Sequence, residues 1–218
     1  MTIMEENRRA ASLGTPGFKS PPKEGEVNMF RLALPQDAPE IVQLYRPYVE
    51  NTTVTFEYET PTKQEMARRI DQLAGRLPWI LAFHEGKLLG YAYAHPYAER
   101  AAYQWSVETS IYMAQHARHL GVGRRLYGAL FELLQCQGLR CAVAIVTSPN
   151  PASDAFHQAL GFEKVGFLPN IGYKQEKWLA VSLWQKAIAP GEKTPPAKVR
   201  PLRELCPETV QKILQEYA

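Results

Sequence analysis

One segment constrains the fold of this chain more than any other. Between Tyr103 and Val146, an alternating strand is followed by a glycine loop, a helix and an apolar strand. Apolar and polar side chains alternate along Tyr103–Met113, which is typical of a strand with one buried face. Leucines then recur at helical spacing up to Gly138, which is placed to end the helix. Cys141–Val146 is nearly all apolar, which predicts a strand buried on both faces.

The remaining segments complete an α/β fold, with a mixed sheet and helices on both faces. Further strands are predicted at Met29–Leu34, Trp79–His84, Leu88–Tyr93, Phe162–Leu168 and Trp178–Lys186. Further helices are predicted after Asp37, from the Thr62-x-x-Glu65 capping box and over Pro151–Leu160.

Proline placement divides the chain. Of 17 prolines in 218 residues, three lie in residues 1–28 and five in residues 189–218. The sequence therefore predicts a flexible N-terminal extension over 1–28, a working domain over 29–188, and a proline-rich linker with a short helix over 189–218. A hydrophobic content of 45% excludes disorder for the chain as a whole.

Charge and cysteine content exclude several classes of partner. The net charge is +3 with no basic stripe, which argues against nucleic acid. No apolar run approaches the ~20 residues that a membrane span needs, and the first ten residues lack the apolar core of a signal peptide. Three cysteines without a CxxC motif favour reduced thiols and a cytoplasmic location.

The loop between the alternating strand and the leucine-rich helix has the features of an anion site. Gly121 and Gly123 let the backbone approach a ligand at the start of a helix, and Arg118 and Arg124 add positive charge. The loop is not a dinucleotide fingerprint, because Leu126 stands where a third glycine is needed. On its own, the pattern is equally compatible with glycines that only make a tight turn.

The motif Arg118-x-x-Gly121-x-Gly123 resembles the acetyl-CoA signature of the GNAT N-acetyltransferases, and Asn150, His157 and Gly161-Phe162 resemble that family's second cofactor segment. Further segments resemble the phosphinothricin N-acetyltransferase subgroup: Thr53–Phe56, Leu77–Phe83, Ala92–Ala94, Tyr103–Thr109, Gly172–Lys174 and Trp178–Gln185. The resemblance implies a mostly antiparallel sheet in which acetyl-CoA lies between two splayed parallel strands. Those strands would be Tyr103–Met113 and Cys141–Val146.

The same resemblance implies the cofactor contacts. Backbone groups of Ile111, Tyr112 and Met113 would hold the pantetheine arm, and Asn150 would hold its thiol end. The pyrophosphate would lie against Arg118, His119, Leu120, Gly121, Val122, Gly123 and Arg124. A metal is not expected, since His116-x-x-His119 has no second pair of ligands.

Direct acetyl transfer in a ternary complex needs a base but no protein nucleophile. Glu108 is the candidate base, although alternation alone also fits a polar residue on a solvated strand face. His157 could act as base, acid or substrate ligand, or be an ordinary residue of a helix surface. The oxyanion donor is expected to be the backbone N–H near Met113.

The acceptor is expected to be a small amino-acid-like molecule. By resemblance, Arg100 and Tyr103 would hold its acid groups, while Phe56 and Tyr93 would form pocket walls or simply pack in the core. Ala98 stands where herbicide-resistance members of the subgroup have lysine, so methionine sulfone or sulfoximine is as plausible an acceptor as phosphinothricin. Alternatives are a peptide or protein acetyltransferase and an acyl-CoA sensor without catalysis. A homodimer is expected by analogy alone.

Overall fold

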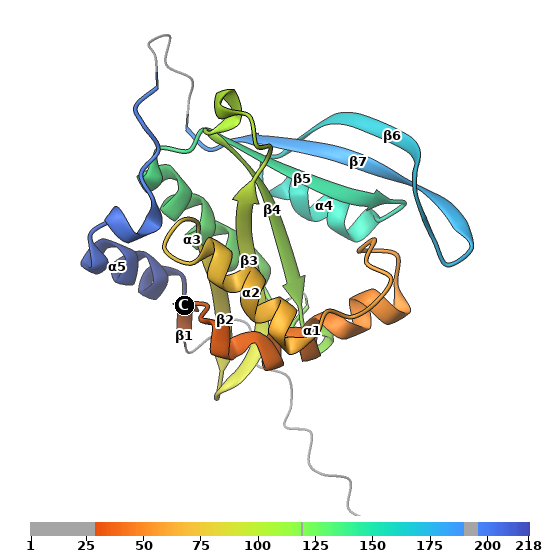
Figure 1. The fold of residues 1–218 in the computed structure, drawn as a ribbon, viewed down its shortest axis with the longest axis horizontal. Helices are drawn as coiled ribbons and strands as arrows, with labels where there is room; N and C mark the ends of the chain where they lie inside the picture. Colours follow the sequence, from red (N-terminus) through yellow and green to blue (C-terminus); the bar gives the residue numbers. More distant parts are fainter. Residues whose placement is uncertain (1–28, 119, 190–195) are drawn as a thin grey trace, which may run out of the picture.

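The computed structural model of the chain describes residues 29–118, 120–189 and 196–218, so the predicted extension over 1–28 and His119 lie outside the described residues. A seven-stranded sheet with the order β1-β2-β3-β4-β5-β7-β6 forms the centre (Figure 1). Its strands are β1 (Met29–Leu32), β2 (Trp79–His84), β3 (Lys87–Pro96), β4 (Ser106–Met113), β5 (Cys141–Ser148), β6 (Glu163–Lys174) and β7 (Lys177–Ala187). Every neighbouring pair is antiparallel except β4 and β5.

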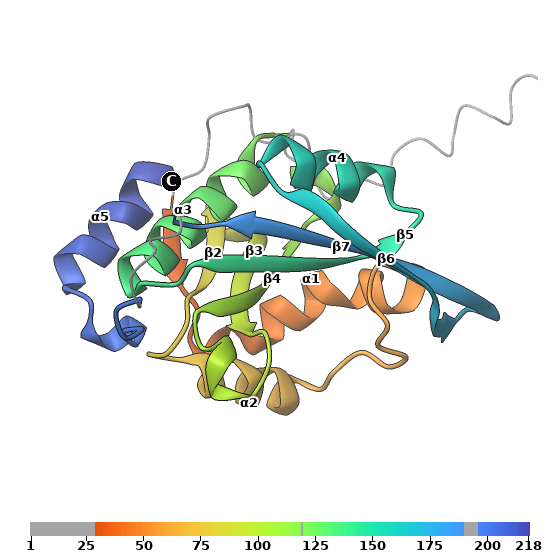
Figure 2. The same ribbon diagram turned by 90° about the horizontal axis from the view of Figure 1, so that it is seen from above.

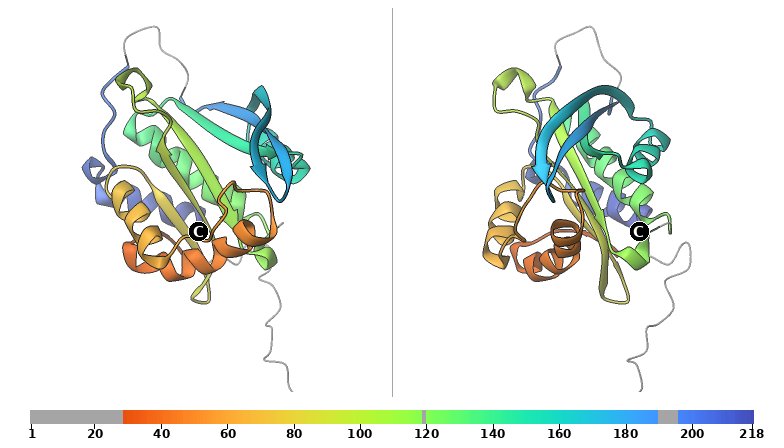
Figure 3. Two further views of the ribbon diagram at one scale, coloured as in Figure 1. Left: turned by 45° about the vertical axis from the view of Figure 1, so that its right-hand side comes forward. Right: turned by 90° about the vertical axis from the view of Figure 1, so that its right-hand side faces the viewer.

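Helices cover both faces of the sheet, as Figures 2 and 3 show. On one face lie α1 (Ala38–Asn51) and α2 (Lys63–Leu73), and on the other lie α3 (Val122–Gln137), α4 (Pro151–Ala159) and α5 (Pro207–Tyr217). Each layer has its own apolar core. The predicted mixed sheet with helices on both faces is confirmed.

Local sequence signals explain where the helices begin and end. The Thr62 hydroxyl accepts the Glu65 backbone N–H at 3.1 Å, so the predicted capping residue does start α2. Gly138 adopts a left-handed conformation with φ of 89° and ends α3. At the C-terminal end of the chain, Ile213 and Leu214 of α5 are buried in the core that α3 shares. No helix among the described residues is long and apolar enough to cross a bilayer.

Two strand predictions need correction. The fourth strand begins at Ser106 rather than Tyr103, because Ala101–Tyr103 forms a 3-10 turn closed by the Gln104 N–H on the Ala101 carbonyl. The prediction that Cys141–Val146 is buried on both faces is wrong, since Ile145 is 46% exposed. The core beneath α1 and α2 contains no β5 residue, so this face of β5 stays uncovered.

The parallel pair separates after three residue pairs. Ser106, Val107 and Glu108 of β4 lie opposite Cys141, Ala142 and Val143 of β5, and no pairing continues beyond them. Both strands run on for five more residues, to Met113 and Ser148. The expected splayed pair is therefore confirmed, and it leaves backbone polar groups of both strands unpaired in the gap.

Candidate active site

A small cavity of about 60 Å³ lies where β4 and β5 separate. Residues of both strands, of α3 and of α4 line it, together with Val54 of the loop between α1 and α2. The lining comprises Val54, Thr109, Ser110, Ile111, Tyr112, Tyr127, Ala144, Ile145, Val146, Thr147, Asn150, Ser153 and His157. The structure thus brings together Ile111, Tyr112, Asn150 and His157, which the resemblance placed along one ligand.

The glycine loop leads from β4 into α3 with a geometry that suits a diphosphate. Gly121 has a φ of 75° with no atom near a Cβ position, so the backbone conformation, not crowding, favours glycine there. The first turn of α3 has no acidic residue, and its free N–H groups carry a partial positive charge. Arg118 lies over the Tyr48 ring at 5.4 Å, and Arg124 is exposed. These residues fit the diphosphate of acetyl-CoA.

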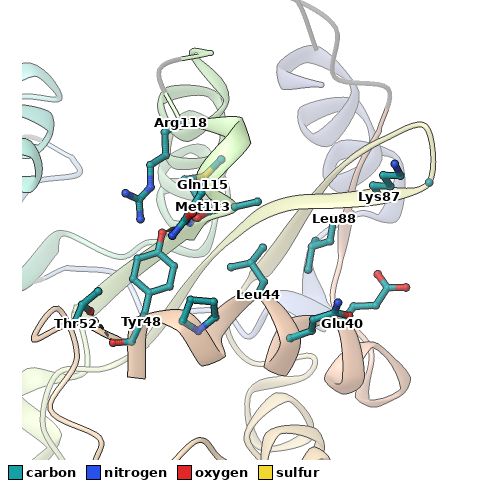
Figure 4. Close-up of a pocket in the computed structure, with 13 residues that line it drawn as sticks. Glu40, Leu44, Tyr48, Thr52, Lys87, Leu88, Met113, Gln115 and Arg118 are labelled. Atoms are coloured by element: carbon teal, nitrogen blue, oxygen red, sulfur yellow. Dashed lines mark hydrogen bonds between the residues drawn. The ribbon is translucent and has the colours of Figure 1, made fainter. Parts of the chain in front are cut away.

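The end of β4 holds a contact that sequence patterns did not reveal. The Tyr48 hydroxyl donates to the Met113 carbonyl at 2.6 Å, and the Met113 N–H donates to the same hydroxyl at 3.1 Å. Figure 4 shows Tyr48, Met113 and Arg118 on the wall of a pocket of about 480 Å³ between α1 and the end of β4. The expected oxyanion donor is therefore already bonded, and a ligand at Met113 must displace Tyr48.

Glu108 lies on β4 directly opposite His95 of β3. The carboxylate Oε1 is 3.7 Å from His95 Nε2, and both side chains are only partly exposed. Burial alone would lower the pKa of His95, but the nearby Glu108 carboxylate, together with the Pro96 carbonyl, outweighs this effect and raises it. Sequence reasoning missed His95, because only the register of β3 against β4 in the fold places it opposite Glu108.

His157 is a buried residue, 4% exposed, so the helix-surface alternative is wrong. Its Nδ1 lies 2.8 Å from the Ser153 carbonyl, which can only accept, so Nδ1 carries the proton. Nε2 is then a bare acceptor, and it has no hydrogen-bond partner among the described residues. Burial also lowers the pKa of His157, which keeps the ring neutral near pH 7.

A larger pocket of about 690 Å³ opens on the α1 and α2 face of the sheet. Tyr93 lines it and stacks on Trp79 at 4.2 Å between ring centroids. Its other lining residues are Tyr45, Glu57, Met66, Arg69, Gln72, Leu73, Arg76, Tyr91, His95, Pro96 and Tyr112. Tyr112 also lines the small cavity, so the two spaces meet at β4.

The other expected acceptor residues lie elsewhere. Phe56 packs on Gly172 of β6, where a Cβ atom would collide with its ring, and it does not line this pocket. Arg100 and Tyr103 flank the turn before β4, with Tyr103 packed on Tyr97, and neither lines the pocket. The cations that do line it are Arg69 and Arg76.

Lys174 of β6 is distant in sequence from α1 and the loop that follows it, but it contacts both. Its buried ammonium donates to the carbonyls of Val49 and Thr55, each at 2.8 Å. Burial lowers the pKa of Lys174, with little opposing effect from Glu57. The bonds tie the β6–β7 hairpin to the loop that carries Phe56. Among the described residues, no group of His, Cys, Asp or Glu side chains could hold a metal ion.

Comparison with known proteins agrees with this geometry. Residues 30–181 match the family model described as an acetyltransferase (GNAT) domain. The phosphinothricin N-acetyltransferase of Streptomyces viridochromogenes is 35% identical over 175 residues, which cover 80% of this chain and 94% of that protein. The L-methionine sulfoximine/L-methionine sulfone acetyltransferase of Pseudomonas aeruginosa is 34% identical over 73% of this chain and 94% of its own.

Among solved structures, a GNAT superfamily phosphinothricin acetyltransferase from Sinorhizobium meliloti in complex with AcCoA aligns with a TM-score of 0.76. It is 34% identical, and the alignment covers 83% of this chain and 98% of that one. The chain therefore belongs to the GNAT family of acetyl-CoA-dependent N-acetyltransferases, in the neighbourhood of the phosphinothricin N-acetyltransferases.

Proposed function

We propose that this chain acetylates the amino group of a small amino-acid-like acceptor, such as phosphinothricin, methionine sulfone or methionine sulfoximine, by direct transfer in a ternary complex. One observation carries the proposal: a roomy pocket on one face of β4 meets a narrow cavity in the strand gap. An amine entering from the first space reaches a thioester held in the second without any covalent enzyme intermediate.

Glu108 is the proposed base. It lies on the pocket face of β4 beside His95, where a carboxylate can take a proton from the acceptor's ammonium directly or through water. Asn150 and the strand backbones at Ile111 and Met113 are proposed to hold the arm of acetyl-CoA, which supplies the activated acetyl group.

The pocket favours an acceptor with an anionic group and an apolar body. Aromatic rings form much of its wall, and Arg76 presents a guanidinium with no ion pair in the described part of the chain. Arg69, in contrast, is neutralised by Glu57 at 2.7 Å and Glu65 at 2.9 Å. Arg76 thus competes with Arg100 for the proposed role of carboxylate ligand.

The loop between α1 and α2 is held in place by hydrogen bonds, which argues against a polypeptide acceptor. Lys174 holds the segment between α1 and α2, and the Tyr58 hydroxyl adds a bond to the Tyr173 carbonyl. A long chain would have to pass this closed segment.

A cytoplasmic location is also proposed, since all three cysteines are free thiols.

Thiol release from acetyl-CoA over a panel of acceptors tests the proposal. Phosphinothricin, methionine sulfone and methionine sulfoximine are expected to give the highest kcat/KM, above matched peptide amines. Highest kcat/KM for peptides would reverse the acceptor class. Tight acetyl-CoA binding without release for any amine would identify a sensor instead.

We also propose a homodimer in which the edge strand β6 forms the contact surface between the two copies. Its outer edge pairs with no strand among the described residues, and it carries exposed apolar side chains, including Phe167 at 52% and Ile171 at 53%. Trp178 at the start of β7 is 64% exposed. An apolar sheet edge of this kind is costly for a monomer in water, and pairing with a second copy would cover it.

A further inference from the structure

Residues 196–205, which precede α5, lie beyond the part of the chain that matches the family model. They form hydrogen bonds with the residue before β4, with the end of α3 and with the turn between α2 and β2 (Figure 1). In that turn, the Gly75 carbonyl accepts the Arg203 N–H at 2.9 Å. The burial of Leu202 and Leu205 explains why this segment docks on the core, but it does not explain its polar contacts.

The side chain of Gln137, at the end of α3, joins this C-terminal segment to the proposed acceptor pocket. It is 1% exposed, and its Nε2 donates to the Arg76 carbonyl at 2.7 Å and to the Arg200 carbonyl at 2.9 Å. Because both partners are carbonyls, the Nε2 end of the amide must face them. Arg76 lines the pocket and Arg200 belongs to the C-terminal segment, so one buried amide connects the two.

The need to pair buried polar groups does not account for this glutamine. The Arg76 carbonyl also accepts the Leu202 N–H at 3.1 Å, so it would keep a partner without the side chain. The Oε1 atom of Gln137, in turn, has no hydrogen-bond partner among the described residues. An apolar residue of the same length would avoid this buried, unpaired oxygen. What the glutamine adds is a second bond that fixes where the Arg76 carbonyl lies.

The backbone of Arg76 is held on both sides. Its N–H donates to the Leu73 carbonyl at 2.9 Å, at the end of α2, while its own carbonyl accepts from Leu202 and Gln137. The guanidinium makes none of these bonds and lines the pocket. A fixed backbone restricts the directions that the side chain can take. A side chain that already points toward its ligand loses less conformational entropy when the ligand binds.

We propose that Gln137 is a positioning residue for the acceptor: it ties the C-terminal segment to the Arg76 carbonyl and thereby holds the Arg76 guanidinium toward the acid group of the acceptor. This inference rests on the proposed function and on the role that it gives to Arg76. Gln137 is not part of the pocket lining, so it acts through Arg76 and not by contact with the acceptor. Its contribution is therefore to acceptor binding, and not to the transfer step or to acetyl-CoA binding.

The test compares the best acceptor of the panel above with its carboxamide, which lacks the α-carboxylate. Gln137→Met keeps the length of the side chain and removes both N–H donors. It is expected to raise the KM of the acidic acceptor about fivefold or more, with kcat, acetyl-CoA affinity and the KM of the carboxamide each changed less than about twofold. A generally loosened fold would affect both acceptors alike. An unchanged KM, or equal rises for the two acceptors, overturns the inference.

Two further variants locate the effect. Arg200→Ala removes a guanidinium bond to the Cys136 carbonyl at 2.9 Å, which also joins the C-terminal segment to α3 but does not involve Arg76. This control is expected to keep the wild-type KM, and a rise equal to that of Gln137→Met overturns the inference. In an Arg76→Ala background, Gln137→Met is expected to raise the KM less than about twofold further, because the group that it positions is gone. A full further rise there also overturns the inference.

Amide hydrogen exchange tests the same coupling in the wild type, should Gln137→Met fail to fold. If the bonds to the Arg76 carbonyl favour acceptor binding, the bound acceptor must in turn stabilise those bonds. Saturating acceptor is therefore expected to slow exchange of the Leu202 amide, which lies outside the pocket, at least about threefold in the wild type and not in Arg76→Ala. Unchanged exchange in the wild type overturns the inference. A wild type that acetylates no amine counts against the proposed function instead.

Discussion

The Glu108 carboxylate on β4 raises the pKa of His95, which faces it from β3. The carboxylate raises the pKa of His95 against the lowering effect of burial. While His95 is protonated, it holds the Glu108 carboxylate in an ion pair and competes with the acceptor's ammonium for it. Loss of the His95 proton breaks this ion pair and leaves the carboxylate free for the acceptor, so activity should increase as pH rises through the raised pKa of His95.

Replacing the proposed base separates chemistry from binding. Glu108→Gln is expected to lower turnover at least about tenfold while acetyl-CoA affinity stays nearly unchanged, because the carboxylate lies on the acceptor face of β4. Initial rates across pH and calorimetric binding measure the two effects. His95→Gln, a matched change of the partner, is expected to shift the pH–rate profile to lower pH. An unaltered profile in Glu108→Gln would contradict the assignment of the base.

Two arginines compete for the acid group of the acceptor. Arg76 lines the proposed acceptor pocket, whereas Arg100 lies outside it, just before the turn that leads into β4. Arg76→Ala is expected to raise the KM of acidic acceptors at least about tenfold with a smaller change in kcat. Arg100→Ala, the matched control, is expected to raise it less. The reverse order would return the role to Arg100, and equal rates on acidic and uncharged amines would exclude both.

Buried His157 makes the stability of the folded protein depend on pH. Its pKa in the folded protein lies below the value of about 6.5 for an unfolded chain, because burial disfavours the charged ring. The unfolded chain therefore binds the proton more readily, and the free energy of unfolding should fall as pH drops below about 6.5. Urea unfolding should show a shallower fall in His157→Asn, which can still donate to Ser153. The exposed His116→Asn should keep the wild-type slope, and identical slopes in both variants would refute the account.

At the scale of elements, the order of strands and helices is predictable because each carries a local signal. The register between strands carries none. Nothing in the spacing of His95 indicates that it faces Glu108, and nothing near Tyr48 indicates that α1 reaches the end of β4. The prediction for Cys141–Val146 is wrong for the same reason, because the composition of a strand does not show that α1 and α2 stop short of it. Motif residues that lie together in the sequence could be placed, while partners from distant elements required the fold.

Helix α3 allows a test of the glycine loop with a control at its other end. Gly121 precedes the helix with φ of 75°, and Gly138 follows it with φ of 89°. Alanine at either position costs about 1 kcal/mol of backbone strain, so both variants should lose similar stability. Only Gly121→Ala is expected to weaken acetyl-CoA binding, by about tenfold or more, because it alters the N–H groups offered to the diphosphate. Equal affinities in the two variants, measured by calorimetry, would mean that the loop does not hold the diphosphate.

At the scale of the whole molecule, the sheet separates two tasks. The α3 and α4 face supplies the cavity with His157 and Tyr127, and the α1 and α2 face supplies the proposed acceptor pocket with Tyr93 and His95. The two spaces share Tyr112 of β4 as a lining residue.

The outer edge of β6 lies close to the proposed acceptor pocket, because the hairpin of β6 and β7 also holds the loop between α1 and α2 through Lys174. Covering the hairpin with a second copy would therefore steady the loop as well as bury Phe167 and Ile171. Light scattering is expected to give twice the mass of one chain for the wild type and a single mass for the double variant Phe167→Glu/Ile171→Glu. That variant should also show a raised acceptor KM at unchanged acetyl-CoA affinity, since loop order is lost while the strand gap is intact. Leu34→Glu changes an equally exposed apolar residue just after β1 and should remain dimeric. A monomeric wild type, or a double variant that stays dimeric, would place the partner surface elsewhere or remove it.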